Sequence, residues 1–193
     1  MNALTQIITQ RMAGGAVSSI AQRLGVSEST ANTAVQVAVP LIIAALARNA
    51  SRPEGAENLH QAVSNDHDGS IFDNLTGYLS NPQSANGAGI LGHVFGGQQS
   101  AIASNVAQAT GMDQPAAGNL LETLAPLVMG AVGQTQQQNG LDAAGLSDML
   151  NNQQQEAQSN APDLMGMLGS MLDQNKDGSA ADDLQRLAAN FFK

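Results

Sequence analysis

Apolar residues recur at helical spacing along most of this chain. One face of a predicted helix over residues 2–13 carries Leu4, Ile7, Ile8 and Met12. The same spacing predicts helices over residues 16–24, 28–48, 56–63, 71–79, 141–154 and 163–172, and an amphipathic helix at the carboxyl end. No segment alternates polar and β-branched residues as a strand would. The pattern therefore predicts an all-α fold.

Glycine, serine and proline predict where these helices begin and end. Gly25 suits a left-handed cap after the helix over residues 16–24, and Ser27 suits the start of the next helix. Pro40 lies in an apolar stretch where it removes one backbone donor. We expect a kink or a break there, with a second helical segment from Leu41 to about Arg48.

One stretch of the chain occurs twice. Residues 20–47 align without a gap with residues 106–133, and most remaining pairs are apolar against apolar. The identical pairs are Ala21/Ala107, Gln22/Gln108, Gly25/Gly111, Ala31/Ala117, Pro40/Pro126, Leu41/Leu127 and Ala45/Ala131. A repeated order of glycine, apolar stripe and proline indicates a duplicated helical unit.

The repeat predicts a multihelical bundle of two tandem related units, residues 1–80 and 81–193, packed as one globular body. The Asn- and Gly-rich residues 81–89 form the clearest break between them. We interpret the glutamine-rich residues 134–140 as a polar linker inserted into the second unit, which ends in a capped carboxyl-terminal helix.

Composition and charge restrict the partners. The chain has 193 residues, a formal charge of −9, no Cys and no Trp. A negative field disfavours nucleic acid and anionic membranes and favours metal cations or basic proteins. The longest apolar run, residues 37–47, is too short to span a bilayer. No signal peptide is apparent, so we expect a cytoplasmic protein without a membrane partner.

Two Asp-rich loops carry the chemistry that this chain offers. The better one resembles the first half of a calcium loop, with oxygen ligands at alternate positions before a glycine, but it lacks the final glutamate. Its candidate ligands are Asp173, Asn175, Asp177, Ser179, Asp182 and Asp183. The weaker loop offers Asp66, Asp68, Ser70 and Asp73.

Helix capping explains the same two loops without an ion. In each, a serine before the helix can accept from free backbone N–H groups, and the acid three residues later, Asp73 or Asp182, favours the positive helix end. His67 lies between Asp66 and Asp68, but adjacent residues rarely converge on one metal, and we interpret this segment as a solvated loop.

Residues 20–31 resemble the turn of a helix-turn-helix DNA reader. The helix that would read DNA, from Ser27 onward, has no Lys or Arg before residue 48. Without basic groups, little in this unit can hold phosphates. A degenerate DNA-binding regulator is therefore a minor alternative.

The order of these motifs resembles the YidB-like bacterial proteins classed as domain of unknown function 937. The residues that carry the resemblance are the GGxxxxIAxxLGVS lead, VPLIIAALARNA, HDGSIFDNL, GILGHVFGG, LAPLVMGAVG and DQNKDGSAADDL. The resemblance implies a small all-helical bacterial protein without an established activity. It implies no catalytic residues.

Function is thus expected to reside in helix surfaces. No Ser/His/Asp grouping or small-molecule site is apparent, so we expect a scaffold or protein-interaction module without enzymatic activity. We expect it to bind a protein partner or to form a homo-oligomer, and not to bind nucleic acid. The leading alternative is a module that Ca2+ stabilises through residues 173–183. A hydrolase is the remaining alternative, and it lacks a nucleophile.

Overall fold

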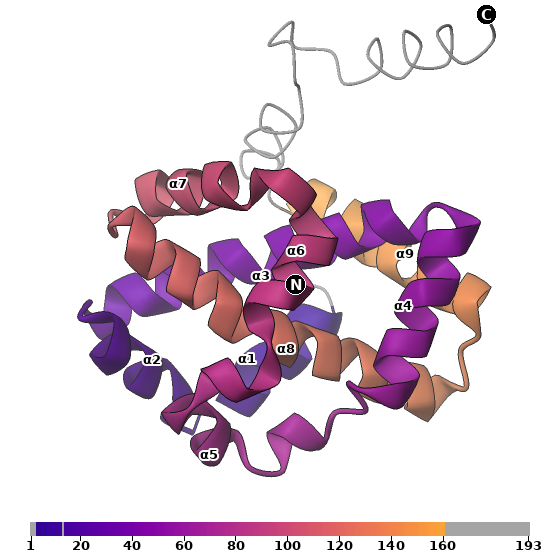
Figure 1. The fold of residues 1–193 in the computed structure, drawn as a ribbon, viewed down its shortest axis with the longest axis horizontal. Coiled ribbons are helices and arrows are strands. Elements are labelled where there is room, and N and C mark those ends of the chain that lie inside the picture. The colour runs from indigo at the N-terminus through magenta and orange to yellow at the C-terminus, as the bar shows by residue number, and fades with distance from the viewer. Residues whose placement is uncertain (1–2, 13, 161–193) are drawn as a thin grey trace, which may run out of the picture.

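The computed structural model describes residues 3–12 and 14–160, which form an all-α, multihelical bundle (Figure 1). Its elements are α1 (Ala3–Met12), α2 (Ala16–Leu24), α3 (Glu28–Ala50), α4 (Pro53–Asn65), η1 (Ser70–Phe72), α5 (Leu75–Ser80), η2 (Pro82–Ala85), α6 (Gly87–Phe95), η3 (Gly96–Gln98), α7 (Gln99–Thr110), α8 (Gln114–Asn139) and α9 (Ala143–Asn160), where η marks 3-10 helices. The described ranges contain no strand, as the sequence pattern predicted.

Helix α8 is the central element of the bundle. It packs against α1, α2, α3, α4, α6 and α7 and against the short elements η1 and η2, and Figure 1 shows it crossing the body between them. Its residues from Thr123 to Gly133 are all buried. A helix that is apolar on every side must be enclosed by others. Most of the fold is therefore arranged around α8, whereas α9 packs on α3 and α4.

The two stretches that align in sequence form matching helix pairs. Gly25 ends α2 and Gly111 ends α7, with φ values of 69° and 73° in the left-handed region. Ser27 and Asp113 then cap α3 and α8 by accepting from the backbone N–H of Thr30 and Ala116. The caps of the first pair are therefore separated along the chain from those of the second pair by the same offset as the aligned sequences.

The predicted break at Pro40 is wrong. Helix α3 is continuous from Glu28 to Ala50, and Pro126 lies inside α8 in the same way. A proline in a helix removes one hydrogen bond, whereas each of these helices buries a long apolar surface on both sides of its proline. Burial of that surface offsets the missing bond.

The predicted linker at residues 134–140 is also wrong, because α8 runs on to Asn139 and only Gly140 caps it, in the left-handed conformation. The side chain of Gln136 donates to the carbonyl of Leu141 at 2.9 Å and lies 3.2 Å from His60 Nε2. Glutamine is a good helix former, so a polar run at a helix end continues the helix. Polar residues 155–160 likewise continue α9.

The helix predicted over residues 71–79 is divided into η1 and α5, with residues 73 and 74 between them. Residues 81–89, predicted as a break, form η2 and the first turn of α6. Short elements joined by turns therefore make up the segment from residue 66 to residue 90, and η1, η2 and α6 of this segment pack against α8.

Two described helices, α3 and α8, are long and apolar enough to cross a bilayer by composition. Inside the fold, 61% of the most apolar part of α3 and 83% of that of α8 are buried. Most of the apolar part of each helix is therefore buried in the core of the bundle.

Candidate functional site

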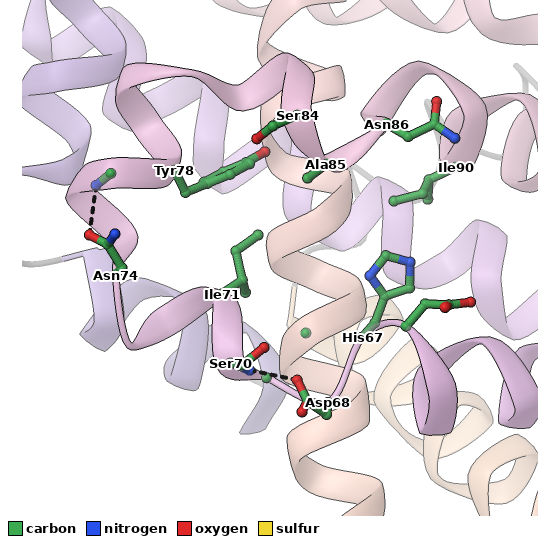
Figure 2. Close-up of a pocket in the computed structure, with 14 residues that line it drawn as sticks. His67, Asp68, Ser70, Ile71, Asn74, Tyr78, Ser84, Ala85, Asn86 and Ile90 are labelled. Carbon is green, nitrogen blue, oxygen red and sulfur yellow. Dashed lines mark hydrogen bonds between the residues drawn. The ribbon is translucent and has the colours of Figure 1, made fainter.

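A hollow of about 680 Å³ lies between the segment from residue 66 to residue 90 and the central helix α8 (Figure 2). We call it the acidic groove. Its lining residues are Asp66, His67, Asp68, Gly69, Ser70, Ile71, Asn74, Gly77, Tyr78, Ser84, Ala85, Asn86, Ile90 and Gly130. Its size is that of a small-molecule or peptide-side-chain site.

Close packing on glycines of α8 positions one wall of the groove. A Cβ atom on Gly130 would lie 2.8 Å from Ile71 Cγ2, and one on Gly133 would meet the carbonyl oxygen of His67. Real Cβ atoms do not approach other atoms so closely. Residues 67–71 thus reach the helix only because α8 lacks side chains at these positions.

Asp68 holds the turn that follows it. Its Oδ1 accepts from the backbone N–H of Ser70 at 2.9 Å, the bond drawn in Figure 2. Hydrogen bonds from the hydroxyl and the N–H of Ser70 lower the pKa of this exposed carboxyl. The prediction that Ser70 caps the helix with its side chain is wrong, because Ser70 is the first residue of η1 and donates its N–H to Asp68 in the preceding turn.

The start of α5 has a cap of its own. Asn74 Oδ1 accepts from the backbone N–H of Gly77 at 3.0 Å. The predicted pairing of Ser70 with Asp73 is replaced by an Asx turn at Asp68 and a helix N-cap at Asn74. The turn and the cap place Ser70 and Asn74 on the rim of the groove.

His67 is half-buried, which differs from the solvated loop expected for it. Figure 2 shows its ring on the same side of the loop as Ile90 and Asn86. Burial lowers the pKa of this imidazole, while the carboxylates of Asp66 and Asp68 oppose the shift. The ring is therefore neutral at pH 7 and offers one donor and one acceptor.

Tyr78 forms the opposite wall, and its hydroxyl is already engaged. It donates to the main-chain oxygen of Thr123 in α8 at 2.7 Å. Burial raises the pKa of the phenol well above its ordinary value, and the charge of Arg23 opposes the shift. Tyr78 is thus an anchor that holds α5 on α8, and its ring is available as an apolar wall.

Among the candidate ligands of the first loop, Asp66, Asp68 and Ser70 line the acidic groove, while Asp73 lies outside it. Within residues 3–12 and 14–160, no three His, Asp or Glu side chains are grouped as metal ligands. The better calcium candidate, from Asp173 to Asp183, lies outside the described residues, and calcium binding there stays a prediction.

Sequence reasoning did not identify Asn74, Tyr78, Asn86 or Ile90 as site residues. The signal for Asn86 was present, since an Asn-Gly pair is typical of a left-handed turn and Asn86 has a φ of 50°. The others follow no local motif. They become a site only through their shared position beside α8.

Comparison with protein families matches residues 6–135, more than half of the chain, to a family described as "Bacterial protein of unknown function (DUF937)". No curated protein matches the chain. No solved structure matches it either.

Proposed function

The chain belongs to this bacterial family of unknown function, and we propose that it is a non-enzymatic protein-interaction module whose acidic groove holds a short basic and apolar segment of a partner. The observation that carries the proposal is the combination, in one hollow, of apolar walls with two carboxylates on the rim.

The walls suit an apolar side chain. Ile71, Ala85 and Ile90 are partly buried and line the hollow together with the ring of Tyr78. A side chain inserted among them would remove apolar surface from water, which gives about 25 cal/mol for each Å² that is buried. The groove therefore has a source of affinity that does not depend on charge.

The rim suits a basic side chain. Asp66 and Asp68 are exposed, and no Lys or Arg lines the groove beside them. The net charge of −9 attracts a basic segment over a longer range. A second copy of this chain carries the same negative charge, so the electrostatics favour a different, basic protein over a homo-oligomer.

The ionisable groups of the groove give no support to catalysis. Asp68 is hydrogen-bonded to Ser70, and Tyr78 is hydrogen-bonded to Thr123. His67 is the one half-buried titratable group of the groove that is left, and no serine or threonine is hydrogen-bonded to its ring among the described residues. A nucleophile and its base need such contact.

Nothing in the two helix pairs favours the DNA-binding alternative. Helix α3 has an acid, Glu28, in its first turn and its one basic residue, Arg48, in its last turn. Helix α8 has no Lys or Arg at all. The helices that would enter a groove of DNA therefore lack groups for its phosphates.

A displayed library of random peptides tests the proposal. Peptides selected by the protein should combine Lys or Arg with apolar residues. Asp66→Asn and Asp68→Asn together should weaken a selected peptide about three- to tenfold at low salt, because each exposed charge contributes modestly. Asparagine at position 68 keeps an oxygen for the Ser70 N–H, so the turn is preserved.

Asp73→Asn is the matched control, because Asp73 is an exposed acid on the same segment that does not line the groove. Its affinity for the peptide should stay unchanged. Selection of peptides without basic residues, or an equal loss of affinity in the control, would contradict the proposal.

A further inference from the structure

A second, smaller hollow of about 240 Å³ lies where α2, η2 and the start of α6 meet α8. Arg23 of α2 and Glu122 of α8 both line it, together with Gln83, Asn119 and Thr123. Asn86 separates it from the acidic groove, because this residue lines both hollows. The proposed function does not use this hollow.

Two opposite charges line this hollow without pairing. Arg23 Nη1 donates one long hydrogen bond, 3.4 Å, to the main-chain oxygen of Leu79. Across the described residues, neither Arg23 nor Glu122 takes part in an ion pair. Each charge is thus left with capacity for a ligand.

The amide side chains around these charges have the same capacity. The carboxamide groups of Gln83 and Asn119 make no hydrogen bond to any described residue. A carboxamide can both donate and accept hydrogen bonds. The hollow therefore presents a cation, an anion and neutral polar groups over a small volume.

We propose that this hollow binds a free α-amino acid as its zwitterion, with the ligand carboxylate on Arg23 and the ligand ammonium on Glu122. The volume lies below the range of about 300–1,000 Å³ that is typical of drug-sized ligands, which suits a molecule of amino-acid size. Charge-assisted hydrogen bonds at both ends orient the ligand.

Net charge selects this class over simple ions. An anion bound to Arg23 alone is repelled by Glu122 and by the acidic protein, and a cation bound to Glu122 alone is repelled by Arg23. A zwitterion has no net charge and satisfies both groups at once. The surrounding amides favour a ligand with a polar side chain.

Titration of the ¹⁵N-labelled full chain with serine and glutamine, followed by amide NMR spectra, tests the proposal. Saturable shifts should occur at the backbone amides of Arg23, Asn119 and Glu122. N-acetylserine lacks the ammonium group and serinamide lacks the carboxylate, so each should bind about tenfold or more weakly than serine.

Arg23→Gln and Glu122→Gln should each weaken serine about tenfold or more, because each removes one charged partner. Arg52→Gln and Glu54→Gln are the matched controls, since both residues are exposed and line neither hollow. Thermal melts show whether each variant folds, and Arg23→Lys keeps the charge if Arg23→Gln unfolds.

Three results would overturn the proposal. The first is the absence of saturable shifts with both amino acids at tens of millimolar. The second is a blocked derivative, N-acetylserine or serinamide, that binds as tightly as serine, which would mean that one charge suffices. The third is unchanged affinity for serine in a folded variant that has lost one charge, Arg23→Gln or Glu122→Gln.

Discussion

Gly87 lies directly against the main-chain oxygen of Glu122, so closely that a Cβ atom at position 87 would overlap it. This oxygen is the acceptor that Pro126, four residues later in α8, leaves without its helical hydrogen bond. The first residue of α6 therefore covers the point where the proline interrupts the central helix. It also sets the distance between α6 and α8, on which both hollows depend.

Gly87→Ala should destabilise the fold by about 1–3 kcal/mol, because a backbone oxygen cannot move aside for the new methyl group. Chemical denaturation measures the change in the free energy of unfolding. Gly92→Ala in the same helix is the control, since a Cβ atom there meets nothing within 4 Å. It should stabilise by about 0.5–1 kcal/mol, and a similar loss in both variants would contradict the close contact at Gly87.

Gly133→Ala should also destabilise by about 1–3 kcal/mol and displace the loop around His67, since the new methyl group would overlap the carbonyl oxygen of that residue. Amide NMR spectra should show the largest shifts at residues 66–71. Gly118→Ala is the control, because Gly118 lies in the same helix with open space around it. Spectra in which residues 66–71 stay unperturbed by Gly133→Ala would be inconsistent with this packing.

His67 should make the fold less stable in mild acid. Burial lowers its folded-state pKa below the ordinary value of 6.5, so the unfolded chain binds the proton more readily. The stabilisation is complete above pH 6.5 and is lost as the pH falls through the folded-state pKa. Melting temperatures of wild type and His67→Gln should therefore converge as the pH falls from about 7 to about 5.

His93→Gln is the control for that pH series, because His93 is exposed. The His93→Gln variant should lose stability in acid as the wild type does. NMR titration of the His67 ring should give a pKa below 6.5. A ring that titrates at or above that value would rule out the burial effect.

Tyr78 should resist ionisation in the folded protein. It is the one tyrosine of the chain, so phenolate absorbance reports this side chain alone. Burial raises its pKa above 10.0, so the unfolded chain ionises first and the stabilisation is lost as the pH rises through the folded-state pKa. Phenolate that appears near pH 10 while the far-ultraviolet circular dichroism stays helical would contradict this.

Tyr78→Phe is a separate test of the hydrogen bond to Thr123. The ring keeps its packing, so the loss should be about 0.5–1.5 kcal/mol, the net contribution of one such bond. Denaturation at neutral pH measures it. A loss near zero would mean that the hydroxyl contributes nothing to anchoring α5.

The helix ends could be predicted from sequence because their interactions are local. Gly25 and Ser27 bond to residues within four positions of themselves, and Gly111 and Asp113 repeat the arrangement. The errors arose where local preference is weak. At Pro40 and in the glutamine run after Gly133, local residues permit either a break or a helix, and packing against distant elements decides.

The acidic groove shows the same difference between features that local sequence predicts and features that packing decides. Asp66 and Asp68 were recognisable as chemistry in the sequence, yet Asp68 proved to be the cap of a turn and Ser70 its donor. Tyr78 and Ile90 carry no local signal. They line a site only because α6 packs beside α8 and the hydroxyl of Tyr78 bonds to the main chain of α8.

The sequence by itself determined the all-α class, the capped turn at Gly25 and Ser27 and the acidic balance, since each depends on neighbouring residues or on composition. Only the tertiary structure decided that α3 and α8 run through their prolines and that Gly87, Gly130 and Gly133 admit close neighbours. It alone also placed unpaired Arg23 and Glu122 in one hollow. Contacts between residues far apart in the chain are set by the packing of whole helices, which no short pattern encodes.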